Sequence, residues 1–167
     1  MTARAKAAFS VLRGIIVATF FTLLLCGLAL EVRRLDPLLG FIPPQWLCPA
    51  GWFLALAGGL LAAYCVVIFG LRGQGTPAPI DPPKIFVVTG PYRYMRNPMY
   101  VGAICILLGA GLIVRSFSIV LLALTFWALA HIFVLFYEEP SLELRFGESY
   151  AQYRRKVSRW IPHARQR

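Results

Sequence analysis

Charged residues are scarce in this sequence, and acidic residues are the scarcest. Only 14% of its 167 residues are charged, with seven Asp and Glu against seventeen Lys and Arg. A soluble globular domain carries about 25% charged residues, so the composition excludes an ordinary water-soluble protein. Hydrophobic residues make up 59% of the chain, and the mean hydropathy is +0.68. The composition therefore predicts an integral membrane protein.

Patterns typical of metal sites and disulfide frameworks are also missing. The four cysteines include no Cys-x-x-Cys pair, and no His stands at ligand spacing from any of them. Three of them, Cys26, Cys65 and Cys105, fall in apolar stretches that we expect to be helical. The sequence thus indicates neither a metal site nor a disulfide scaffold.

Four long stretches of the chain carry no charge at all, and a helix needs about 17–25 apolar residues to cross the hydrocarbon core. These stretches predict helices over about residues 9–30, 50–71, 97–114 and 117–137. We expect an all-α, polytopic membrane protein with about four transmembrane helices and a single domain over residues 1–167. Apolar residues 35–49 are interrupted by four prolines, which exclude a continuous helix there. That connection is either re-entrant or interfacial.

The basic residues are distributed unevenly along this plan. If the four helices alternate in direction, one side carries Arg33, Arg34 and Arg115, and the other carries the remaining fourteen of the seventeen. Such an excess marks the cytoplasmic side. Both termini should be cytoplasmic, in a bacterial inner membrane or, in a eukaryote, the endoplasmic reticulum. Membrane topology, and not nucleic-acid binding, then accounts for the net charge of +10.

Local signals set the boundaries of the last two spans. Asn97 is a favoured N-cap and Pro98 suits the first position of a helix. Arg115 and Ser116 form a tight turn, which makes the third and fourth helices an antiparallel hairpin. Gly109 and the nearby Gly111 are expected at helix-packing positions.

Beyond Tyr137 the chain becomes polar, and Gly147 should end a short helix there. A helix from about Ser149 is amphipathic and basic, which suits the cytoplasmic membrane surface. We expect the aromatic residues of this C-terminal segment to anchor it at the interface; they are Tyr150, Tyr153 and Trp160.

Polar groups suited to a ligand of both signs converge on the cytoplasmic side. The start of the third helix brings Arg93 and Arg96, and a helix N-terminus with arginine suits an anion. The hairpin places Glu138 and Glu139 opposite, where carboxylates suit an ammonium or ribose hydroxyls. The arginines also fit ordinary juxtamembrane residues. Acidic residues at a helix C-terminus oppose the helix dipole, however, which favours a functional role. His131 is either functional or a hydrogen-bonded packing residue.

These residues resemble a known family. Residues 90–102, the Tyr-Glu-Glu-Pro of residues 137–140 and the tail that ends in Arg159-Trp160-Ile161-Pro162 are similar to the membrane methyltransferases. That family includes isoprenylcysteine carboxyl methyltransferase and the phospholipid N-methyltransferases. The resemblance covers about the C-terminal half of the chain, with its motifs in residues 72–162. It implies S-adenosylmethionine as cofactor and a lipophilic acceptor from the bilayer, either an isoprenylcysteine-type carboxylate or a phospholipid amine.

The resemblance also implies roles for individual residues. The Arg-His-Pro-x-Tyr signature of the family stands here as Arg96-Asn97-Pro98-x-Tyr100, so Asn97 replaces a titratable histidine and excludes acid–base chemistry at that position. Glu138 and Glu139 match the family's Glu-Glu pair and are candidate catalytic residues as well. The implied cofactor-binding residues are Arg93, Arg96, Asn97, Tyr100, Glu138, Glu139, Gly73 and Gly75.

A second interpretation belongs to a different class of function. The chain would then be a non-catalytic membrane partner or assembly protein that keeps the methyltransferase fold. A degenerate relative is expected to lose one of the two motifs, and both the Arg-Asn-Pro-x-Tyr and the Glu-Glu elements are intact here. The enzyme interpretation is therefore favoured.

Overall fold

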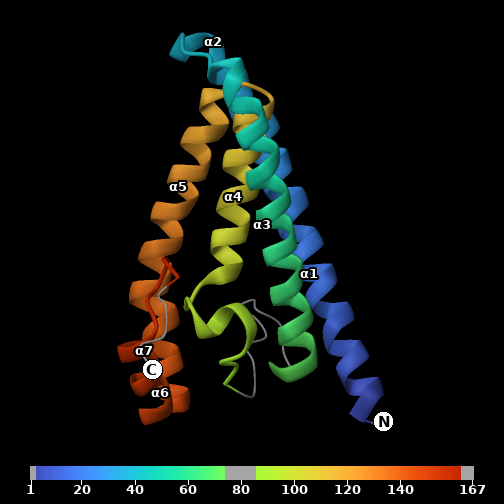
Figure 1. The fold of residues 1–167 in the computed structure, drawn as a ribbon, viewed down its shortest axis with the longest axis vertical. Coiled ribbons are helices and arrows are strands. Elements are labelled where there is room, and N and C mark those ends of the chain that lie inside the picture. The colour runs from blue at the N-terminus through green and yellow to red at the C-terminus, as the bar shows by residue number, and fades with distance from the viewer. Residues whose placement is uncertain (1–2, 74–85, 163–167) are drawn as a thin grey trace. The chain divides into compact units, whose positions relative to one another are not determined.

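The computed structural model describes residues 3–73 and 86–162, and this part of the chain is almost entirely helical (Figure 1). The long helices are α1 (Ala3–Val32), α3 (Cys48–Ile68), α4 (Pro98–Ile113) and α5 (Phe117–Phe133). The shorter elements are η1 (Arg33–Leu35), α2 (Asp36–Leu39), η2 (Gln45–Leu47), η3 (Phe69–Gly73), η4 (Gly90–Arg93), η5 (Val134–Glu138), α6 (Glu139–Phe146) and α7 (Glu148–Lys156). The prediction of an all-α protein is confirmed.

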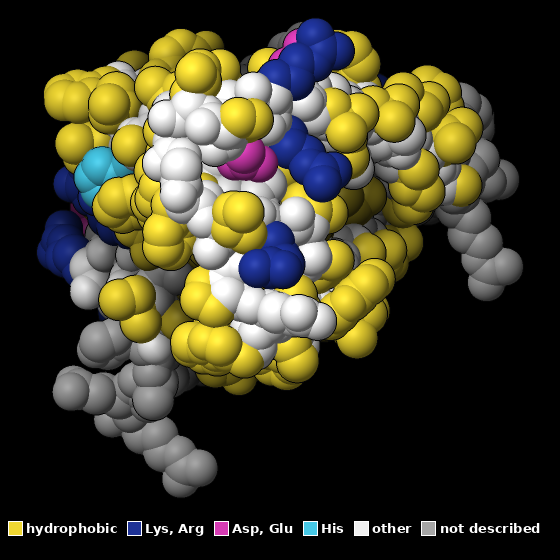
Figure 2. Space-filling view, turned by 90° about the horizontal axis from the view of Figure 1, so that it is seen from above, with side chains coloured by type: hydrophobic (Ala, Val, Ile, Leu, Met, Phe, Trp, Pro, Cys, Tyr) yellow, Lys and Arg dark blue, Asp and Glu magenta, His cyan; other side chains and the backbone are white. Residues whose placement is uncertain are grey.

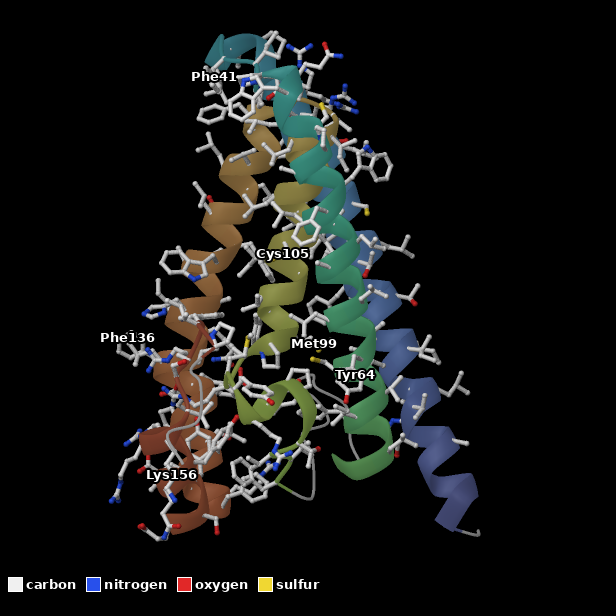
Figure 3. All side chains as sticks on the ribbon, viewed as in Figure 1. Phe41, Tyr64, Met99, Cys105, Phe136 and Lys156 are labelled. Atoms are coloured by element: carbon white, nitrogen blue, oxygen red, sulfur yellow. The ribbon has the colours of Figure 1, made fainter. Side chains whose placement is uncertain are left out.

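Among the described residues, three helical stretches are long and apolar enough to cross a membrane. They are Ala8–Leu39, Gln45–Leu71 and Phe117–Phe146. Helix α4 is apolar but has 16 residues, which at about 1.5 Å per residue is shorter than the hydrocarbon core. Large apolar side chains point outward: Phe136 lies on the outside of its helix (Figure 3) and is 74% exposed. Hydrophobic side chains cover much of the face in Figure 2, and Lys and Arg side chains lie among them. The chain is an integral membrane protein.

The contacts of the chain fall into two compact units. The first unit comprises Met1–Ala18, Ala63–Pro98 and His131–Arg167, and the second comprises Thr19–Ala62 and Met99–Ala130. The first unit carries most of the predicted site residues.

Glycines allow close helix contacts in the second unit. A Cβ atom on Gly58 of α3 would lie 2.6 Å from the carbonyl oxygen of Gly102 on α4. A Cβ atom on Gly109 would lie equally close, 2.6 Å, to the carbonyl oxygen of Gly51. Gly111 faces α5, where its Cβ would meet Val120 at 3.0 Å. The predicted packing role of Gly109 and Gly111 is confirmed.

The connection between α1 and α3 is broken into short turns, as its prolines predict, and it is tied to the α4–α5 turn. Arg115 forms that turn with φ of +54°, and its Nε donates to the carbonyl oxygen of Pro43 at 3.0 Å. Asp36 Oδ1 accepts a hydrogen bond of 2.9 Å from the backbone N–H of Ser118. An N–H in the first turn of α5 thus finds its acceptor on a segment far away in the sequence.

The end of the fourth predicted helix differs from expectation. The helix does not stop at Tyr137, because α5 passes through the π-helical η5 directly into α6. The Glu139 N–H donates to the carbonyl of Val134, five residues earlier, and Pro140 follows at once. Proline lacks an N–H and its ring crowds the preceding turn, and we attribute the wider π turn to that conflict. Glu138 and Glu139 therefore lie inside a continuous helical stretch. The helix-dipole argument made for them from the sequence was wrong.

Candidate functional site

A buried carboxylate forms the centre of the first unit. Glu139 is 4% exposed. Its Oε1 accepts a hydrogen bond of 2.8 Å from Nε of Arg159, and its Oε2 accepts one of 2.9 Å from Nη2. Nη1 of Arg96 lies 2.7 Å from the same Oε1. Two parallel bonds from one guanidinium are among the strongest hydrogen-bonded pairs in proteins. We call Arg96, Glu139 and Arg159 the Glu139 cluster, and it carries one positive charge in excess.

The segment after α7, residues 157–162, is here named the strap, and it runs beside residues 95–97. Met95 and Ser158 form an isolated parallel bridge. The backbone N–H of Arg96 donates to the carbonyl of Ser158 at 2.9 Å. Asn97 donates twice to the carbonyl of Arg159, from its backbone at 3.2 Å and from Nδ2 at 3.3 Å. The strap is therefore held by backbone and side chain next to the start of α4.

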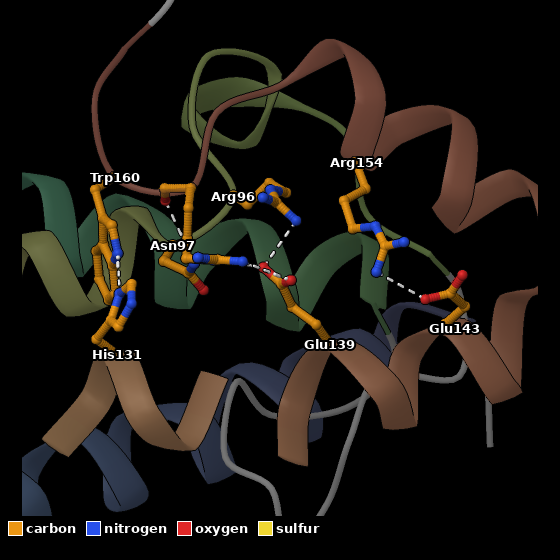
Figure 4. Close-up of polar contacts among 8 residues, drawn as sticks. Arg96, Asn97, His131, Glu139, Glu143, Arg154 and Trp160 are labelled. Carbon is orange, nitrogen blue, oxygen red and sulfur yellow. Dashed lines mark hydrogen bonds and ion pairs between the residues drawn. The ribbon is translucent and has the colours of Figure 1, made fainter. Parts of the chain in front are cut away.

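His131 is also tied to the strap. Nε1 of Trp160 donates to Nδ1 of His131 at 3.0 Å (Figure 4). Of the two roles left open for His131, hydrogen-bonded packing has this observed partner. Trp160, expected as an interfacial anchor, is half-buried and directed to another helix of its own unit.

The tyrosines of α7 do not form the expected interfacial anchors. Tyr150 is 2% exposed and Tyr153 is 8% exposed, and both rings pack on Phe86 at centroid distances of 5.7 and 5.1 Å. The Tyr153 hydroxyl donates to the carbonyl of Tyr92 at 2.6 Å. The apolar face of α7 thus packs against protein. Burial raises the pKa of Tyr150 to about 12, and burial likewise raises the pKa of Tyr92 and of Tyr153.

The structure brings together only some of the predicted site residues. Arg96, Asn97 and Glu139 meet in the first unit, and all three are at least nine-tenths buried. Glu138 is half-buried beside them. Burial is the main cause of the raised pKa of Tyr92 and of Tyr150, and the negative charge of Glu138 is one of the smaller causes.

The remaining predicted residues are more dispersed. Arg93 is exposed on η4, and Gly73 is the last residue of η3. Tyr100 is half-buried on α4 and belongs to the second unit. Gly75 lies outside the described residues. The first unit by itself therefore contains the Arg-Asn and Glu-Glu elements.

Arg159 is the residue that sequence reasoning missed. It was noted only as part of a tail motif, whereas both of its bonded nitrogens are committed to Glu139. A signal was available, because a carboxylate expected beside apolar helices needs cations close by. Nothing in the local sequence identified which of the many basic residues supplies the second cation.

Arg96 retains hydrogen-bonding capacity. Its side chain is 10% exposed, and it shares a hydrogen bond with the hydroxyl of Tyr150. Its Nε and Nη1 are buried and make no directed hydrogen bond to any described residue. A buried guanidinium with spare donors and excess charge suits a carboxylate or a phosphate. Within residues 3–73 and 86–162, no group of three His, Cys, Asp or Glu could hold a metal ion.

The phospholipid methyltransferase family model matches residues 51–149, more than half of the chain. The chain belongs to this family of methyltransferases. The matched region includes Arg96, Asn97 and Glu139 of this family member, and it ends before Arg159.

Two known proteins extend the comparison. Protein-S-isoprenylcysteine O-methyltransferase of Schizosaccharomyces pombe is 38% identical over 79 residues, which cover 47% of this chain and 33% of that protein. A solved structure of the eukaryotic intramembrane Ras methyltransferase, isoprenylcysteine carboxyl methyltransferase, superposes with a TM-score of 0.56 at 23% identity. That match covers 93% of this chain and 50% of the solved one. This family member therefore spans about a third to a half of the length of these two proteins, and the solved structure shows the same fold.

Proposed function

We propose that this protein transfers a methyl group from S-adenosylmethionine to a lipophilic acceptor in the membrane. One observation carries the proposal: Arg96 is buried, keeps unused donors, and belongs to a cluster with one positive charge in excess. Such a group suits the carboxylate at the amino-acid end of the cofactor. Membership in a methyltransferase family supports the assignment.

The residues present fit the cofactor. Arg96 would hold its carboxylate, and Glu138 would hold its ammonium or a ribose hydroxyl. Asn97, Tyr100, Arg93, Gly73 and Gly75 stay proposed cofactor contacts. When bound, the cofactor supplies a methyl group on a sulfonium, which is reactive without covalent help from the protein. What the chain must then provide is in-line positioning within about 3–3.5 Å and exclusion of water.

The two glutamates receive different roles in this proposal. Both oxygens of Glu139 accept hydrogen bonds from Arg159, so Glu139 is poorly placed to accept a proton. Glu138 is the better candidate to take the proton from an amine acceptor. A carboxylate acceptor needs no base. Glu138→Gln should therefore reduce the rate of methyl transfer more with an amine acceptor than with a carboxylate acceptor.

Two acceptor classes follow from the relatives, a phospholipid amine and an isoprenylcysteine-type carboxylate. We propose to separate them with labelled methyl groups in nanodiscs. One set would contain phosphatidylethanolamine, and the other an S-farnesylcysteine analogue in phosphatidylcholine. Label in the lipid fraction of the first set assigns an amine acceptor, and a base-labile label in the second assigns a carboxylate.

We further propose a membrane topology for a single domain over residues 1–167. The chain crosses four times, with α4 as the shortest span, and both termini are cytoplasmic in a bacterial inner membrane or the endoplasmic reticulum. The asymmetric distribution of Lys and Arg supports this orientation. Labelling of a single cysteine introduced at Arg34 or at Gln152, in sealed vesicles of known orientation, tests it.

Equilibrium binding of S-adenosylmethionine to the purified protein is the deciding experiment. Arg96→Ala and Glu138→Gln should each weaken binding at least tenfold, which is about 1.4 kcal/mol. Arg145→Ala is the matched control, since Arg145 is an exposed arginine on α6 of the same unit. A folded wild-type protein that binds no cofactor, in detergent and in nanodiscs, contradicts the proposal and leaves the non-catalytic membrane partner.

A further inference from the structure

We propose that Arg159 is a positioning residue that keeps Arg96 available for the anionic end of the cofactor, because Arg159 takes up the charge of Glu139. The inference deepens the proposed function and rests on it. It concerns a residue outside the region matched by the family model.

The geometry makes Arg159 the principal partner of Glu139. Arg159 donates one directed hydrogen bond to each carboxylate oxygen, at 2.8 and 2.9 Å. The distance from Nη1 of Arg96 to Oε1 is 2.7 Å, and this nitrogen makes no directed hydrogen bond there. The hydrogen bond to Glu139 is also the main cause of a raised pKa at Arg159. The carboxylate is thus satisfied without full engagement of Arg96.

Charge balance gives this arrangement its consequence. Two arginines and one glutamate leave one positive charge in excess, inside a site where the Glu139 side chain is only 5% exposed. Without Arg159, Arg96 becomes the principal remaining cation beside Glu139. In a poorly solvated site the two would form a neutral pair. The Arg96 guanidinium would then be paired with Glu139 and no longer available for the cofactor carboxylate.

The strap explains why Arg159 can do this from the far end of the chain. Asn97 holds the carbonyl of Arg159 through two hydrogen bonds. The next residue, Trp160, donates to His131. The backbone of Arg159 is therefore fixed on both sides, so its guanidinium is preorganised for Glu139. In this arrangement Asn97 acts on the cluster through Arg159.

A charge-restoring double variant tests the proposal. The measurement is the Kd of S-adenosylmethionine for the wild type, Arg159→Gln, Arg159→Lys, and Glu139→Gln combined with Arg159→Gln. The single Arg159→Gln should weaken binding at least tenfold, about 1.4 kcal/mol. The double variant again has one positive charge, on Arg96, and should recover to within about threefold of the wild type, about 0.7 kcal/mol. Arg159→Lys keeps the positive charge and should weaken binding of S-adenosylmethionine less than Arg159→Gln does.

A second ligand makes the test specific for the carboxylate. Decarboxylated S-adenosylmethionine lacks the group that Arg96 would bind, so Arg159→Gln should leave its Kd unchanged. If Arg159 only holds the strap in place, the double variant should bind S-adenosylmethionine as weakly as Arg159→Gln does. The Kd values of both ligands should then rise by the same factor. Either result overturns the proposal.

The outcomes also separate this inference from the proposed function. A wild type that binds no S-adenosylmethionine overturns both. A wild type that binds, with a folded double variant that does not, overturns only the role of Arg159. If Arg159→Gln fails to fold by gel filtration, the double variant decides alone, because it has the same excess charge as the wild type.

Discussion

Arg159 holds both carboxylate oxygens of Glu139, a residue that lies twenty positions earlier in the chain. The pair joins the strap to the first turn of α6, and it does so in a buried setting. Each hydrogen bond between charged groups contributes about 1.5–3 kcal/mol to stability. The strap is therefore an integral part of the first unit.

The contact between Trp160 and His131 should contribute to holding the strap. Trp160→Phe removes the donor while keeping an aromatic ring, and we expect a loss of about 0.5–1.5 kcal/mol in unfolding free energy. Hydrogen exchange of the strap amides should become faster. Trp46→Phe is the control, because Trp46 is 76% exposed. Equal effects of the two substitutions would contradict a specific role for the Trp160 hydrogen bond.

Neighbouring glycines of α3 should respond oppositely to alanine. A Cβ on Gly58 meets the Gly102 carbonyl at 2.6 Å, whereas a Cβ on Gly59 meets nothing within 4 Å. Gly58→Ala should therefore destabilise the protein by about 1–3 kcal/mol through overpacking. Gly59→Ala should be neutral or stabilising by up to about 1 kcal/mol, through helix propensity. Unfolding in detergent followed by circular dichroism measures both, and similar values for the pair would refute the close contact.

Asp36 should stabilise the start of α5 from a distance. Its Oδ1 accepts the backbone N–H of Ser118 at 2.9 Å, so Asp36→Ala should cost about 0.5–2 kcal/mol, as the loss of a helix cap does. The control is Glu31→Ala, which breaks an exposed ion pair with Arg34. Exposed pairs contribute little, and that variant should unfold like the wild type. An unchanged stability of Asp36→Ala would argue against the cap.

Stability should fall in alkaline solution partly because of Tyr150. Burial raises its pKa from 10.0 to about 12, so the unfolded chain loses this proton first. The contribution of Tyr150 is fully present below pH 10 and is lost as the pH rises to about 12. The unfolding free energy of the wild type should therefore decline more steeply over this range than that of Tyr150→Phe. Parallel curves for the two proteins would show that Tyr150 is not the titrating group.

Much of the fold was predictable because it depends on local properties of the chain. Charge-free stretches predicted the long helices, the Asn97-Pro98 step predicted the start of α4, and Arg115-Ser116 predicted the turn into α5. Two helix boundaries differ from the prediction: α1 begins at Ala3 and not near residue 9, and the fourth predicted helix does not end at Tyr137. The π turn before Pro140 carries the helix past Tyr137, and propensity alone gives no signal for a widened turn that accommodates a proline.

The sequence predicted which residues belong to the site better than it predicted which of their side chains contact each other. Arg96, Asn97 and Glu139 were identified from short motifs, and all three lie in the first unit. The motifs left open whether Glu139 faces a ligand or another side chain. Its partner Arg159 comes from a segment that helical periodicity treats as a surface element.

The sequence by itself determined that the chain is a helical membrane protein with methyltransferase motifs, because hydropathy, charge spacing and short motifs are local properties of a sequence. Only the tertiary structure decided which side chains meet. An apolar face on α7 is equally suited to lipid and to Phe86, and a basic residue is equally suited to solvent and to a buried carboxylate. The packing of the strap beside residues 95–97 decides between these alternatives. The charge of Glu139 can be buried there because arginines from two distant segments compensate it.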